Sequence, residues 1–274
     1  METQTQQPEK QERKKRIGIL LLLLLCLLTL AGTMSWLTHS SQLDNEFTVG
    51  KISEIDPGGG GPVDPKDPDD PTNPIDPDGN DSRLDGNLFE PHWKPDAKLE
   101  PGVTIPKDPY VGVGKGSEAC YVFVNVTSNM NNNNHIYFEL QDGWEAVDAK
   151  AITVEDDQDV PTSKAAGKTY YTSGLFMYTK GLDGSEASGN VWTTAPVFAN
   201  IIVDEAADEA DFLKKDIKDQ KSQDEPADSF KPTITVQSYL HQKTKPNNED
   251  KEGERSEISV GTAKDNAKEF FKAQ

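Results

Sequence analysis

Residues 120–126 read CYVFVNV, and this stretch decides the fold class. It is rich in β-branched and aromatic residues, which favour strands, and its apolar side chains partly alternate. Cys120, Val122, Val124 and Val126 therefore share one face of a predicted strand, and we expect that face to be buried. Because Cys120 lies on this face, its thiol is predicted to be a buried, inert group, with an intermolecular disulfide as the alternative.

Similar patterns recur on both sides of this strand. Residues 135–140 place Ile136, Phe138 and Leu140 on one face, and residues 232–240 also alternate. Further β-rich runs are found at 47–55, 111–113, 168–180 and 197–203. Turn-forming residues separate the runs, and no crossover helices intervene. About seven such strands predict a mainly β fold, an antiparallel β-sandwich of the jelly-roll kind.

Two helices are predicted toward the C-terminal end. One is inserted between strands and has a helically spaced stripe of Ala206, Ala210, Leu213 and Ile217. The other is C-terminal and has a stripe of Ala263, Ala267, Phe270 and Phe271. We expect both to cover an edge or an end of the sheet rather than to enter a membrane or a partner.

The N-terminus carries an export signal over residues 1–36. Residues 13–16 are basic (RKKR) and residues 17–34 form an uncharged apolar run, which predicts a cytoplasmic flank followed by a signal peptide or a signal anchor. Cleavage needs small residues, which the stretch Thr33, Met34 and Ser35 supplies, whereas Trp36 fits poorly. We therefore expect cleavage near residues 35–37, with retention as a membrane anchor as the alternative.

A linker rich in Asp, Pro and Gly spans residues 56–92, between an N-terminal strand region (37–55) and the predicted main domain (93–274). Proline lacks an N–H donor and the aspartates repel one another, so this composition favours an extended, disordered spacer. Calcium binding by the carboxylates is an alternative, although no EF-hand loop can be laid over the segment. No other cofactor is predicted.

Composition and motifs argue against several functions. A net charge of −19, from 28 Lys+Arg and 47 Asp+Glu, disfavours nucleic-acid binding. The four histidines lie too far apart in sequence for a zincin motif, at His39, His92, His135 and His241. No G-x-S-x-G motif is present, and the glycines at 112, 114 and 116 lack the spacing of a phosphate-binding loop. We therefore predict no catalytic, cofactor-binding or metal-binding residue, and no enzyme activity.

The residues around the export signal form a recognisable pattern. A Gly-Thr pair closes the apolar run, an aromatic residue follows, and Asn-x-Phe-Thr-Val-Gly enters a strand; the residues are Gly32, Thr33, Trp36, Asn45, Phe47, Thr48, Val49 and Gly50. This pattern resembles the TasA/camelysin family of exported Gram-positive proteins, which a SipW-type signal peptidase processes. Pro101-Gly102, Lys107-Asp108-Pro109 and the run from Gly116 to Val124 strengthen the resemblance.

The resemblance implies a secreted, cell-surface structural protein that assembles into biofilm-matrix fibres with like subunits or related matrix proteins. Membrane contact would be limited to residues 17–34. The expected mechanism is strand donation, in which Phe47, Val49 and Ile52 fill pockets along the sheet edge of the next subunit. The alternatives are a camelysin-like surface metalloprotease and a membrane-tethered adhesion or ligand-binding module.

Overall fold

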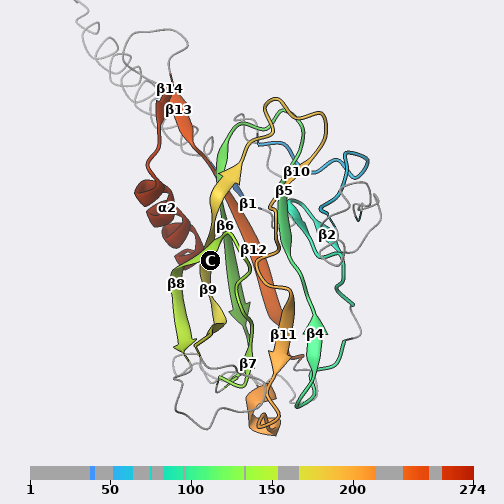
Figure 1. The fold of residues 1–274 in the computed structure, drawn as a ribbon. Coiled ribbons are helices and arrows are strands. Elements are labelled where there is room, and N and C mark those ends of the chain that lie inside the picture. The colour runs from blue at the N-terminus through green and yellow to red at the C-terminus, as the bar shows by residue number, and fades with distance from the viewer. Residues whose placement is uncertain are drawn as a thin grey trace, which may run out of the picture.

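The computed structural model describes residues 38–40, 52–63, 75, 83–94, 97–132, 134–153, 167–213, 231–246 and 255–274. Within these ranges the protein is mainly β, and all of its strand pairs are antiparallel (Figure 1). The predicted fold class is therefore confirmed at this level. The sheets are open rather than closed on themselves.

The largest sheet has five strands in the order β1-β12-β6-β9-β8. Their bounds are β1 Thr38–Ser40, β6 Cys120–Ser128, β8 Trp144–Thr153, β9 Thr169–Leu182 and β12 Ile234–Gln242. The predicted strand at 120–126 becomes β6, a central strand, because nearly all of its side chains are apolar. It pairs with β12 over nine residues, from Ile234↔Ser128 to Gln242↔Cys120.

Three smaller sheets accompany the largest one. A four-stranded sheet in the order β10-β5-β3-β2 consists of Val191–Trp192, Tyr110–Val113, Leu88–Phe89 and Leu84–Asp85. A three-stranded sheet in the order β4-β11-β7 consists of Thr104–Pro106, Asn200–Val203 and Ile136–Tyr137. The last sheet pairs β13, Thr244–Pro246, with β14, Arg255–Glu257.

The main core is one cluster that contains residues of the five-stranded sheet and of the four- and three-stranded sheets. The predicted inner face of β6 is fully buried, since Cys120, Val122, Val124 and Val126 all have 0% exposure. This face packs in one cluster with residues from the other sheets and from the chain that precedes β11, among them Val111, Val113, Phe198 and Ile201. The alternation that predicted β6 is therefore explained by a core on one side of it.

The C-terminal helix α2, Val260–Lys272, covers the other face of the five-stranded sheet (Figure 1). Ala263 and Ala267 are fully buried, so the helix approaches the sheet closely. The ring of Phe270 stacks on that of Tyr239 at 4.8 Å between centroids. The predicted C-terminal helix and its apolar stripe are confirmed, and the Ser259 side chain caps its N-terminus by accepting a hydrogen bond from the Thr262 N–H.

Several predicted elements differ from the structure. The inserted helix appears only as a short 3-10 helix, η2, at Glu209–Phe212, and residues 214–230 lie outside the described residues. Strand β8 was not predicted, because charged residues such as Glu145 and Lys150 interrupt its apolar pattern. Residues 83–92, assigned by composition to the linker, include strands β2 and β3, which extend the sheet that contains β5.

Residues 17–34, the predicted membrane segment, lie outside the described residues. The predicted processing residues also lie outside them: Gly32, Thr33, Met34, Ser35 and Trp36. Within the described ranges, none of the helices combines the length and the apolar character needed to cross a bilayer.

Candidate functional site

An N-terminal strand lies on the edge of the largest sheet. Strand β1 pairs antiparallel with β12 through Thr38↔His241, His39↔Leu240 and Ser40↔Tyr239. The other edge of β12 is fully paired with β6. The β1 pairing covers Tyr239, Leu240 and His241 of β12. The first described residues after the predicted export signal therefore form the edge strand of this sheet.

The predicted donor strand, residues 47–55, is not a strand in its described part. Residues 52–55 belong to no sheet, so this prediction was wrong for them, while Phe47 and Val49 lie outside the described residues. The backbone of residues 52–55 bonds to a loop of the domain instead of to a strand. The Ser53 N–H donates to Ser117 Oγ (2.8 Å), and the Ser53 carbonyl accepts from the Gly114 N–H (2.9 Å). These bonds to a loop replace the ladder of a sheet.

Residues 52–60, which we call the strap, are bound to the domain along their length. Asn190 holds the middle of the strap, because its side-chain oxygen accepts from the Asp56 N–H (3.0 Å) and its amide donates to the Asp56 carbonyl (2.6 Å). The Trp192 indole N–H donates to the Gly60 carbonyl (2.9 Å). Ile55 is only 8% exposed and Ile52 packs against the main core. The strap therefore anchors the chain to its own domain.

Glycines allow the strap to approach the domain. A Cβ atom at Gly114 would lie 2.0 Å from the Glu54 carbonyl oxygen, and one at Gly112 would lie 2.7 Å from the Ile55 side chain. Real Cβ atoms essentially never lie this close to a non-bonded atom. Gly112 and Gly114 are therefore required because a side chain at either position would collide with the strap. The sequence alone did not indicate this role.

The histidines are held in separate places. His92 Nδ1 lies 2.7 Å from Asp108 Oδ2, and His135 Nδ1 lies 2.7 Å from Asp211 Oδ2. His241 is buried, with Nδ1 donating to the Gln242 carbonyl (2.7 Å) and Nε2 near the Asn266 amide (2.9 Å); burial lowers the pKa of His241. Among the described residues, no group of three His, Cys, Asp or Glu side chains is placed to hold a metal ion.

Cys120 lies where its sequence pattern placed it, on the inner face of β6. Its side chain is fully buried in the main core, and burial raises the pKa of its thiol to about 12. A thiol with this pKa is protonated at neutral pH and is a poor nucleophile. Its environment is that of a core residue.

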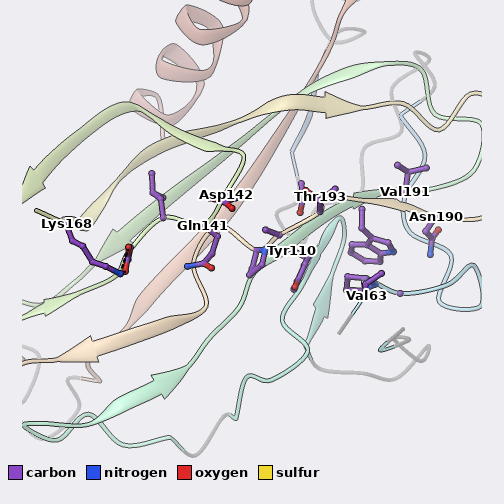
Figure 2. A pocket seen from close by; sticks show the side chains of 16 residues that line it. Val63, Tyr110, Gln141, Asp142, Lys168, Asn190, Val191 and Thr193 are labelled. Atoms are coloured by element: carbon purple, nitrogen blue, oxygen red, sulfur yellow. Dashed lines mark hydrogen bonds and ion pairs between the residues drawn. The ribbon is translucent and has the colours of Figure 1, made fainter. Parts of the chain in front are cut away.

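A groove of about 1020 Å³ runs beside β10 (Figure 2). Its lining consists of residues 61–63, Tyr110, residues 139–142, Lys168 and residues 190–196. Lys168 lies at the end opposite Val63 in Figure 2 and forms an exposed ion pair with Glu139 at 2.8 Å. Because these two charges neutralise each other, the groove offers the Asp142 carboxylate together with amides, hydroxyls and apolar side chains for contact.

Comparison of the chain with protein-family models, curated proteins and solved structures gave no match. The geometry described above therefore carries the functional argument. Neither the strand β1 nor the strap was predicted from the sequence. The strap depends on Asn190, which lies 134 residues away from Asp56, and no local pattern signals such a contact.

Proposed function

We propose that the chain is an exported, non-enzymatic structural protein of the cell surface, a TasA-like fibre subunit. Its domain would be a jelly-roll-like β-sandwich, and its copies would assemble by exchange of the N-terminal strand. The observation that carries the proposal is the position of β1 on the edge of β12. In this proposal the donated strand starts at residues 38–40, whereas the sequence had suggested residues 47–55 as the donated strand.

The β1 ladder is small enough to be exchanged. It has three residue pairs, and cross-strand pairs each contribute about 0.2–1 kcal/mol, so the docked strand is held by only a few kcal/mol. A second copy of β1 would make the same contacts with the same edge, so exchange between copies leaves the ladder unchanged. Such exchange is governed mainly by the local concentration of subunits.

The strap gives the exchange a fixed pivot. It holds residues 52–60 on their own domain through Ser53, Asp56 and Gly60, whereas β1 belongs to the five-stranded sheet. About eleven residues separate the two, and a chain of that length reaches at most about 40 Å. This reach suffices to place β1 on a neighbouring subunit while the strap stays in place.

Head-to-tail exchange leads to open polymers. Each copy would donate β1 to the next copy and accept β1 from the previous one, and this type of contact generates filaments unless the rotation closes a ring.

Proline substitution in β1 tests this proposal. In an antiparallel ladder alternate residues donate their N–H to a given neighbour, so His39→Pro combined with Ser40→Pro removes at least one donor of β1 in either pattern. We expect the mature chain to form filaments at raised concentration and the double-proline variant to remain a folded monomer. The matched variant, His39→Ala with Ser40→Ala, should still polymerise. Filaments of the proline variant, seen by electron microscopy, would refute strand exchange.

A further inference from the structure

The groove beside β10 has no part in the strand exchange proposed above. Its volume of about 1020 Å³ lies at the upper end of the range of sites that hold small organic molecules. In Figure 2 its labelled lining residues extend from Lys168 at one end to Val63 and Asn190 at the other, so the groove is elongated. Its lining allows the chemical class of a ligand to be inferred.

One wall of the groove, at residues 194–195, is held in place by hydrogen bonds. The Thr194 N–H donates to the Tyr178 hydroxyl (3.1 Å), and this hydroxyl also lies 2.9 Å from Thr194 Oγ1. The Trp144 indole N–H donates to the Ala195 carbonyl (3.1 Å). Because this wall is fixed before a ligand arrives, little conformational entropy is lost there on binding.

The indole of Trp192 gives the groove a flat apolar surface. Part of the ring packs closely on β5, since a Cβ atom at Gly112 would lie 2.5 Å from Trp192 Cε3. The indole N–H donates to the Gly60 carbonyl (2.9 Å), so its polar atom is already used by the strap. The side chain is half-buried and lines the groove. What it offers to a ligand is therefore apolar ring surface.

Two neighbouring polar side chains supply hydrogen-bonding groups to the groove. Gln141 is half-buried and Asp142 is exposed, and within the described part of the chain neither side chain has a hydrogen bond or an ion pair. The Gln141 amide has two N–H donors and an acceptor oxygen, whereas the Asp142 carboxylate only accepts. Together they can bind a ligand with donors and acceptors on adjacent atoms, as the hydroxyls of a sugar ring are.

The charges of the lining argue against a charged ligand. Lys168 is paired with Glu139, and Asp142 adds a negative charge in a chain whose net charge is −19. An anionic ligand would therefore be repelled. A cationic ligand would find one exposed carboxylate, and exposed ion pairs contribute little to binding. A neutral ligand that carries many hydroxyl groups fits this lining better than either.

We propose that the groove binds a neutral oligosaccharide. The C–H face of one sugar ring would pack on the Trp192 indole, and its hydroxyls or those of the next ring would bond to Gln141 and Asp142. The elongated shape of the groove suits a chain of sugar rings better than a single ring. The proposal does not depend on strand exchange, because residues of β1 and β12 do not line the groove.

Isothermal calorimetry of the mature chain with cellohexaose, maltohexaose and chitohexaose tests the proposal. We expect saturable binding of at least one of these neutral hexasaccharides. Asp142→Ala should weaken it about tenfold and Gln141→Ala about fivefold, because each removes hydrogen bonds to the ligand. The matched variant Asp148→Ala removes an exposed carboxylate on β8 outside the groove and should leave the affinity unchanged. Urea midpoints close to that of the unsubstituted chain would show that the variants fold.

Salt dependence separates sugar recognition from charge attraction. The affinity for the neutral saccharide should change less than about twofold between about 0.05 M and about 0.5 M NaCl, since no charge pairs with the ligand. Absence of binding by all three saccharides would overturn the proposal. So would equal affinities of the Asp142 and Asp148 variants, or tighter binding of the deacetylated, cationic form of chitohexaose that is lost at high salt.

Discussion

Gly114→Ala should detach the strap from the domain. The added Cβ would lie 2.0 Å from the Glu54 carbonyl oxygen, and because both groups belong to the backbone, the strap has to move. Its movement breaks the Gly114 N–H bond to the Ser53 carbonyl, worth about 1 kcal/mol, and exposes Ile55, worth about 2 kcal/mol. We expect the free energy of unfolding, measured by urea titration, to fall by about 3 kcal/mol.

A double-mutant cycle shows whether the loss comes from the strap. Ile55→Ala alone should cost about 2–3 kcal/mol, because the side chain is almost fully buried. In the Gly114→Ala background the same change should cost less than about 1 kcal/mol, because Ile55 has already left its site. Additive losses, or a Gly114→Ala variant as stable as the unsubstituted chain, would refute this reasoning.

Gly261→Ala is the control for a glycine with free space. The site lies in the first turn of α2, and its added Cβ would meet only Ser259 Oγ, at 3.8 Å. Alanine favours helix over glycine by about 0.8–1 kcal/mol in a helix interior, so this variant should be slightly more stable. The two glycine variants should therefore shift the urea midpoint in opposite directions.

Three further predictions concern a buried ion pair, the core thiol and processing. Lys107→Met leaves the Glu90 carboxylate buried without its cation and should cost about 3 kcal/mol at pH 7. Burial raises the pKa of Glu90, so the folded variant binds the proton more tightly than the unfolded chain. The loss in free energy of unfolding, measured by urea titration, should therefore be smaller at pH 4 than at pH 7. An equal loss at both pH values would contradict this. Cys120, with its pKa raised to about 12 by burial, should react with a thiol reagent only in denaturant, and rapid labelling of the native chain at pH 8 would show that it is accessible. N-terminal sequencing of secreted protein should find a first residue between Trp36 and Thr38, whereas finding only full-length protein in membranes would favour the tethered-module alternative.

Elements with a strong periodic pattern could be predicted from the sequence. The alternation of Val122, Val124 and Val126 predicted a strand with one buried face, and the structure puts a core on that face. The stripe of Ala263 and Ala267 predicted a helix that packs closely, and both side chains are fully buried. In both cases the residues of one periodic face pack into a core, so the local sequence pattern is sufficient to predict the element and its buried face.

Elements that depend on distant contacts could not be predicted. Strand β8 at the sheet edge carries charged residues on its exposed positions, which hides its alternation. The strap has almost no periodicity, and its position depends on the small size of Gly114 and on the Asn190 side chain. Strand β1 is three residues long and gains its structure from β12, two hundred residues later in the chain. Only tertiary contacts define such segments.

In the proposed assembly, β1 connects one copy of the chain to the next. Its most direct test is electron microscopy of two forms at the same raised concentration, residues 37–274 and residues 47–274. The shorter form lacks β1 but keeps the strap, so it should stay folded and its free energy of unfolding should fall by no more than the few kcal/mol that the β1 ladder contributes. We expect filaments from residues 37–274 and only monomers from residues 47–274. Filaments that form as readily without residues 37–46 would contradict it.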